Sequence, residues 1–146
     1  MSTSIVMDSP LGHLKITACG ESITHCFFTQ EPLSSGVSSL VLNRAAEQLN
    51  EYFDGKRAQF DLKLAPRGTD FEQAVWQALL NIPYGQTSSY QAVAKVVNNP
   101  EAVRAVGRAN GKNPIAIIIP CHRVIRASGE LGDMLVAWTI KPGCWI

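Results

Sequence analysis

The spacing of apolar residues changes near residue 66, and this change limits the folds that the chain can adopt. Before it, apolar and polar residues alternate in short runs, as in β-strands. After it, apolar residues recur at every third or fourth position, as in helices. The sequence therefore predicts an α+β fold, with an N-terminal domain over residues 1–65 and a C-terminal domain over residues 66–146.

The N-terminal part is expected to form a small sheet with one helix. Strands are predicted over residues 3–8, 14–19 and 22–29. In the third of these segments apolar residues occur at both parities, which predicts a strand covered on both faces. Helical spacing over residues 40–53 predicts a helix that ends at Gly55, and the alternation of Phe60, Leu62 and Leu64 predicts one more strand.

The C-terminal part carries three signals for the start of a helix. They are Thr69 with Glu72, Ser88 with Gln91, and Asn99 with Pro100. The first two have the capping-box spacing, and the third places proline at the first helical position. The last two predicted helices are short and close together, so we expect a helix-turn-helix.

The last of these helices has a basic stripe. Arg104, Arg108 and Lys112 are four residues apart and should share one face. The small residues Ala105 and Gly107 lie between them and would allow the helix to approach a partner closely. Such a surface suits the phosphates of DNA, although a solvated charged face beside a helix contact gives the same pattern.

Composition limits the class of protein. The longest apolar run, Ile115–Ile119, is too short to cross a bilayer, and no secretory signal begins the chain, so we expect a cytoplasmic protein with no membrane partner. We also expect a monomer. Residues 1–65 hold five Lys/Arg and seven Asp/Glu, whereas residues 66–146 hold eight and five. The basic excess therefore lies in the half with the predicted helix-turn-helix.

Cysteine usage points to free thiols. The four cysteines form no C-x-x-C pair and no zinc framework, so the sequence predicts no metal and no cofactor. His25 and Cys26 could belong to a metal site, but the alternation of residues along a strand already accounts for their positions.

The pair Cys121-His122 follows the apolar run and a proline. An imidazole near a thiol can take its proton and activate it as a nucleophile. A buried structural cysteine beside an unrelated histidine is the other interpretation, and the pair alone does not decide between them.

A resemblance to the O6-alkylguanine-DNA alkyltransferases favours the first interpretation. It covers most of the chain and depends on five segments in order: Gly68–Trp76, Ile82–Gly85, Ser89-Tyr90, Arg104–Gly107 and Pro120–Val124 (PCHRV). The last segment is similar to the active-site motif of the family. The resemblance implies a ribonuclease H-like N-terminal domain and a winged helix-turn-helix C-terminal domain.

The resemblance also implies roles for individual residues. Cys121 is the alkyl acceptor, His122 activates it through a water molecule, and Tyr90 aids release of the guanine. Arg104 enters the duplex in place of the extruded nucleotide. The remaining implied DNA contacts are Ala105, Arg108, Lys112 and Ser89. Asn113 is a hinge between the recognition helix and the active-site segment, and Arg123 has a structural hydrogen-bonding role.

These roles predict DNA repair by direct transfer of an alkyl group from O6-alkylguanine, or from O4-alkylthymine, in duplex DNA. Each molecule would act once, because the thioether product is a poor leaving group. In a eukaryotic cell the protein would be nuclear. Two alternatives remain open at this point: a DNA-binding module that recognises alkylated bases but transfers poorly, and a cysteine hydrolase that uses Cys121 and His122.

The resemblance ends after Gly132. The family continues with a Gly-Tyr loop, a Leu-rich helix with a Trp, and a carboxylate that orients the active-site histidine. Here the sequence reads DMLVAWTIKPGCWI, in which Asp133 is the last carboxylate and Pro142 opposes a helix. Codons allowed for residues 132–146 can spell GYAGGLDHKAWLLD in another frame. We therefore hypothesise a frameshift near Gly132, which sequencing of the encoding DNA would test.

Overall fold

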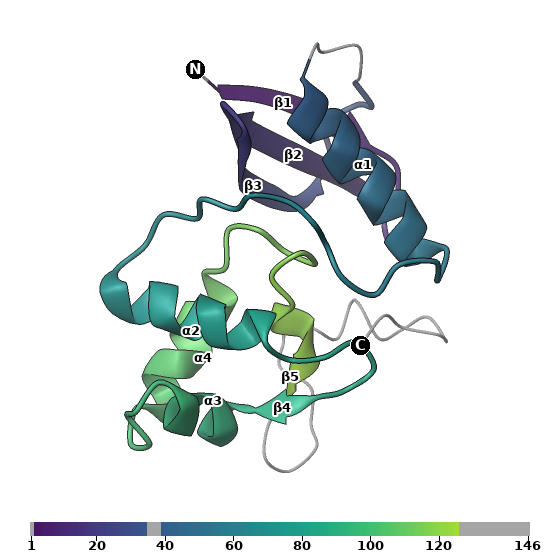
Figure 1. Ribbon diagram of the computed structural model, residues 1–146. Coiled ribbons are helices and arrows are strands. Elements are labelled where there is room, and N and C mark those ends of the chain that lie inside the picture. Colours follow the sequence, from purple (N-terminus) through teal and green to yellow (C-terminus); the bar gives the residue numbers. More distant parts are fainter. Residues whose placement is uncertain (1, 35–38, 126–146) are drawn as a thin grey trace. The chain divides into compact units, whose positions relative to one another are not determined.

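The computed structural model describes residues 2–34 and 39–125 of the chain (Figure 1). The chain forms two compact units. One comprises the described residues up to Arg67 together with Pro114–Ile118, and the other comprises Gly68–Asn113 and Ile119–Ile125. The apolar run therefore begins in the first unit, although it lies far beyond the predicted N-terminal domain in sequence.

The first unit contains an antiparallel sheet of three strands with one helix. The strands are β1 (Ser2–Met7), β2 (His13–Cys19) and β3 (Ser22–Thr29), in the order β1-β2-β3, and the helix is α1 (Leu40–Phe53). The helix lies along the sheet (Figure 1). Alternate residues of β2 and one stripe of α1 form the core, which includes Leu14, Ile16, Leu42, Leu49 and Tyr52. The predicted strands and helix are confirmed.

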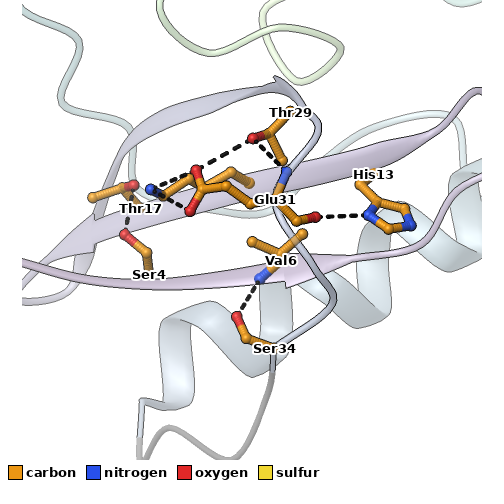
Figure 2. Close-up of polar contacts among 8 residues, drawn as sticks. Ser4, Val6, His13, Thr17, Thr29, Glu31 and Ser34 are labelled. Carbon is orange, nitrogen blue, oxygen red and sulfur yellow. Dashed lines mark hydrogen bonds and ion pairs between the residues drawn. The ribbon is translucent and has the colours of Figure 1, made fainter.

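The face of the sheet opposite this core carries polar pairs (Figure 2). The Lys15 ammonium lies 2.9 Å from a Glu31 carboxylate oxygen, and the hydroxyls of Ser4 and Thr17 are 2.9 Å apart. Exposed pairs of this kind stabilise a fold little. On the same face His25 is exposed and Phe27 is 40% exposed, so the prediction of a third strand covered on both faces is wrong. The reason is that α1 packs on only one face of the sheet (Figure 1).

The segment after α1 differs from its prediction. Instead of a further strand it forms one isolated bridge, between Leu64 and Ile23. The buried carboxamide of Gln48 takes both backbone groups of Asp61: Nε2 donates to the carbonyl at 3.1 Å and Oε1 accepts from the amide at 2.8 Å. These backbone groups bond to a side chain and are lost to a strand ladder.

The second unit is mainly helical. Its elements are α2 (Asp70–Leu80), β4 (Ser88–Ser89), α3 (Tyr90–Val96), α4 (Val103–Gly111), the 3₁₀ turn η1 (Cys121–Arg123) and β5 (Val124–Ile125). The indole Nε1 of Trp76, on α2, donates to the carbonyl of Ala109, on α4, at 2.9 Å. Both groups are buried, so this bond fixes α4 against α2.

Of the three predicted helix starts, the structure confirms one and places the other two at different residues. Thr69 and Glu72 form the predicted capping box. The cap of α3 is Ser89, which accepts from the amide of Ala92, rather than Ser88. Helix α4 begins at Val103 rather than beside Asn99, because the Asn99 carbonyl accepts from the Ala102 amide at 3.0 Å and closes a separate turn first.

In the part of the chain that the structure describes, no helix has the length and apolar character needed to span a bilayer.

Candidate active site

The chain reaches Cys121 through two tight turns in succession. The Ala116 carbonyl accepts from the Ile118 amide at 2.8 Å, and the Ile119 carbonyl accepts from the Cys121 amide at 2.8 Å. Each is a three-residue γ-turn. The first is centred on Ile117, whose φ of +71° is strained for a β-branched residue. The surrounding structure therefore holds the backbone before the cysteine in a conformation that Ile117 by itself disfavours.

The thiol of Cys121 lies at the first residue of η1 and is 1% exposed. Burial raises its pKa above the ordinary value, because the thiolate loses solvation. Three hydrogen bonds act in the opposite direction: one from the Asn113 side chain and two from the backbone amides of Cys121 and His122. Burial therefore favours the neutral thiol, whereas the three hydrogen-bond donors favour the thiolate.

Asn113 connects the end of α4 to this turn. Its Nδ2 donates to the Ile119 carbonyl at 2.8 Å, and its side chain also contacts the thiol of Cys121. One carboxamide thus fixes both the backbone before the cysteine and the cysteine itself.

His122 is 2% exposed and follows Cys121 within the 3₁₀ turn. In an extended chain neighbouring side chains would point to opposite sides, but consecutive side chains of a 3₁₀ turn are rotated by roughly 120°. His122 and Cys121 therefore project at an angle instead of in opposite directions.

Arg123 fastens the turn to the loop after α2. Its Nη1 donates to the Ile82 carbonyl at 2.7 Å, and its guanidinium carbon lies 5.7 Å from the centre of the Tyr84 ring. The side chain is buried, so this charge-assisted bond is shielded from water.

Strands β4 and β5 bring a second segment to the turn. They pair in parallel, Ser88 with Val124 and Ser89 with Ile125. Ser89 also caps α3, and Tyr90 is the first residue of that helix. The pairing thus places Ser89 and Tyr90 beside the segment that directly follows Arg123.

Helix α4 has two different faces. Arg104, Arg108 and Lys112 are exposed, and none forms an ion pair with another described residue. Ala105 is partly exposed between them. Lys112 is the C-cap of the helix and not part of its last turn. The basic stripe is therefore open to a polyanion.

The inner face of α4 holds a residue that the sequence argument missed. Asn110 is 4% exposed, and no described residue donates a hydrogen bond to its Oδ1. Its burial could have been inferred from the sequence. Asn110 lies four residues after the apolar Val106 and three before Asn113, so it shares their side of the helix.

His25 and Cys26 do not form a joint site. Cys26 is completely buried, which raises its pKa to about 12, whereas His25 is exposed on the opposite face of β3 and hydrogen-bonds to Thr24. Among the described residues, no three His, Cys, Asp or Glu side chains are grouped to hold a metal ion. The tail after Gly132, and with it the frameshift hypothesis, lies outside the described residues.

Comparisons with protein families agree with this arrangement. Residues 4–66 match the ribonuclease-like domain of 6-O-methylguanine DNA methyltransferase, and residues 70–143 match its DNA-binding domain. The second match continues past Gly132. The expected α+β fold with these two domain types is confirmed.

Individual proteins give the same result. The methylated-DNA–protein-cysteine methyltransferase of Methanosarcina barkeri is 45% identical over 142 residues, covering 93% of this chain and 90% of its own. That of Mycobacterium tuberculosis is 47% identical over 130 residues, covering 86% and 79%.

Solved structures of the M. tuberculosis protein are also similar. The O6-methylguanine methyltransferase has a TM-score of 0.82 at 45% identity, covering 90% of this chain and 83% of its own. The protein named OGT in complex with DNA has a TM-score of 0.78 at 48% identity, covering 86% and 80%. By the match of both domains and by these identities, the chain belongs to the 6-O-methylguanine DNA methyltransferase family.

Proposed function

We propose that this protein repairs DNA by moving an alkyl group from O6-alkylguanine, or from O4-alkylthymine, in duplex DNA to Cys121. The observation that carries the proposal is a buried thiol in the PCHRV segment with three hydrogen-bond donors directed at its sulfur. A thiolate is the reactive form of cysteine, and hydrogen bonds to sulfur stabilise it. Membership of the methyltransferase family supports this assignment.

The reaction is a displacement at the alkyl carbon. His122 takes the thiol proton, and the sulfur of Cys121 forms a bond to the carbon as the bond from carbon to O6 breaks. The electron pair of that bond passes to the base, Tyr90 supplies a proton to it as charge builds, and the proton that His122 has taken replaces the one that Tyr90 has lost. The products are guanine and S-alkylcysteine. No cofactor or metal takes part, and each molecule reacts once.

Access to the carbon requires the nucleotide to leave the base stack. In our proposal the exposed stripe of α4 contacts the duplex, with Arg108 and Lys112 on phosphates. Arg104 fills the space that the nucleotide leaves. Ala105 allows close approach, and Ser89 donates to a phosphate at the start of α3.

Two residues support the site without touching the reacting atoms. Asn113 is the hinge between α4 and the turn, and Arg123 holds the turn against the Ile82 loop. We also propose that residues 1–65 and 66–146 act as the two functional domains, and that the protein works in the cytoplasm as a monomer.

Intact-mass measurement after incubation with a duplex containing O6-methylguanine tests the proposal. We expect a gain of one methyl group per molecule, mapped by peptide analysis to Cys121. Cys121→Ser should abolish the gain and keep duplex binding, whereas the control Cys19→Ser, at an exposed thiol, should react like the parent. Methylation at another cysteine, or repeated turnover, would contradict the assignment.

A further inference from the structure

Strand β3 pairs with two segments besides β2, and both pairings are single parallel bridges. One bridge joins Ile23 to Leu64, and the other joins Cys26 to Ile115. In a regular strand, residues three apart direct their backbone groups to opposite edges. The register between β2 and β3 shifts between these two positions, and this irregularity lets both Ile23 and Cys26 bond to a segment other than β2.

The second bridge holds the segment that leads to the active site. The Cys26 amide donates to the Pro114 carbonyl at 2.9 Å, and the Cys26 carbonyl accepts from the Ala116 amide at 2.8 Å. Cys26 and Ile115 are completely buried, so these two bonds are shielded from water. They fix a segment that ends only a few residues before Cys121 in the chain.

The strained turn begins where this anchor ends. The Ala116 amide bonds to Cys26, and the Ala116 carbonyl closes the γ-turn around Ile117. The φ of +71° at Ile117 is unfavourable for a β-branched residue and persists only where the surrounding structure holds it. On the other side of the turn, the Asn113 side chain holds the Ile119 carbonyl. The strained residue therefore lies between two fixed points, and the first of them is β3.

We propose that the edge of β3 at Cys26 is a positioning element for alkyl transfer. By anchoring Pro114–Ala116, it keeps Ile117 in its strained turn and so sets the position and the enclosure of Cys121. Without the anchor, Ile117 relaxes to a negative φ and the chain approaches Cys121 along another path. The backbone of Cys26 has this role, and its side chain does not. This inference rests on the proposed function and adds a supporting residue that no motif marks.

Deleting one backbone donor tests the anchor, and the first bridge of β3 provides a matched control. Ala116→lactic acid changes the amide N–H into an ester oxygen and keeps the methyl side chain. Ala65→lactic acid deletes an equivalent donor, which bonds to the Ile23 carbonyl at 2.8 Å. Single-turnover methyl transfer is measured against the concentration of a duplex with O6-methylguanine for the parent and both variants. The labelling of Cys121 by iodoacetamide is measured without DNA.

We expect both variants to lose similar thermal stability, because each lacks one backbone hydrogen bond to β3. At saturating duplex, Ala116→lactic acid should transfer about tenfold more slowly than Ala65→lactic acid, since a displaced nucleophile is poorly aligned. The duplex concentration that gives half the maximal rate should be the same in both, because α4 is unchanged. Iodoacetamide should label Cys121 faster in the Ala116 variant, because the thiol is less enclosed.

Two results would overturn the inference. One is equal maximal transfer by the two variants, and the other is a loss of duplex affinity in the Ala116 variant at an unchanged maximal rate. If that variant does not fold, hydrogen exchange of the parent decides, because an Ala116 amide that exchanges as fast as an exposed one would refute the anchor. A parent that transfers no methyl group would overturn the proposed function. The anchor would then be judged by iodoacetamide labelling alone, with equal rates in both variants refuting it.

Discussion

Replacing Arg123 by methionine separates the support of the active site from its chemistry. Methionine has a similar length and fills the buried space, but it cannot donate a hydrogen bond or carry charge. The substitution therefore leaves the Ile82 carbonyl without its 2.7 Å donor and removes the cation from the Tyr84 ring. The reactive thiol and the basic stripe of α4 are unchanged.

The magnitude follows from these two contacts. A hydrogen bond from a charged donor contributes about 1.5–3 kcal/mol, and a buried carbonyl left unpaired costs a similar amount. The cation over a partly exposed ring adds about 0.5–1 kcal/mol. Removing the buried charge also removes its desolvation cost, which offsets part of this loss of stability. We therefore expect Arg123→Met to lower the free energy of unfolding by about 2–3 kcal/mol.

Chemical denaturation, duplex binding and single-turnover transfer should respond differently to this change. The Ile82 loop leads into β4, whose pairing with β5 places Tyr90 beside the active-site turn, so transfer should fall by about tenfold or more. Binding to an undamaged duplex should stay within about twofold, because α4 makes those contacts. Tyr84→Phe, which keeps the aromatic ring, is the control. A variant as stable and as fast as the parent would refute the supporting role of Arg123.

Three further predictions address packing, DNA and pH. Gly68→Ala places a Cβ 2.5 Å from Cη2 of the buried Trp76, so thermal melting should show a loss of about 1–3 kcal/mol, and an unchanged melting temperature would contradict the packing. Arg104→Ala should slow transfer from duplex more than transfer from free O6-methylguanine, whereas Arg108→Ala should mainly weaken binding and reduce its salt dependence; equal loss on both substrates for Arg104→Ala would argue against insertion into the duplex. Because burial raises the pKa of Cys121, the transfer rate should still be rising above about pH 8.5, where a free thiol is half ionised, and a plateau below that pH would oppose a protonated resting thiol.

The same pKa shift affects stability in the opposite direction. A folded-state pKa above the unfolded value means that the folded protein holds its proton longer. Stability is then complete below the unfolded pKa and falls as pH rises toward the folded value. Cys26, with a pKa of about 12, should add to this alkaline loss, so Cys26→Ala should flatten the dependence of unfolding free energy on pH above about 8.5.

Sequence patterns predicted correctly the elements whose positions depend on interactions between residues close together in the chain. The capping box of Thr69 and Glu72 satisfies backbone donors within four residues, so its sequence alone places the start of α2. Asn99 and Pro100 have an equally good local signal, yet they form a turn and α4 starts at Val103. The strand predicted from Phe60, Leu62 and Leu64 fails for a related reason, because the buried Gln48 of α1 takes both backbone groups of Asp61.

The candidate site shows the same division. Cys121, His122 and Arg123 are adjacent in sequence, so a motif identifies them together. The partners of Arg123 and Trp76 are backbone carbonyls 41 and 33 residues away, and any residue can supply a carbonyl. Nothing in the sequence marks such an acceptor. The positive φ of Ile117 is unpredictable for another reason, since its residue type opposes the conformation that the fold imposes.

A protein that reacts once has a particular need for a guarded nucleophile. An exposed thiolate would react with any soluble electrophile, and each such event would consume one molecule. Enclosing Cys121 at 1% exposure keeps the thiol protonated and out of reach. Burial alone would make the thiol unreactive. Cys26 is the example, since burial raises its pKa and no hydrogen bond to its sulfur acts in the opposite direction. The difference between the two cysteines is the set of donors from Asn113 and the backbone of the 3₁₀ turn. The strained turn before the cysteine and the buried Arg123 after it lie on either side of the segment that carries these donors, so we expect the stability of this segment to maintain the reactivity of Cys121.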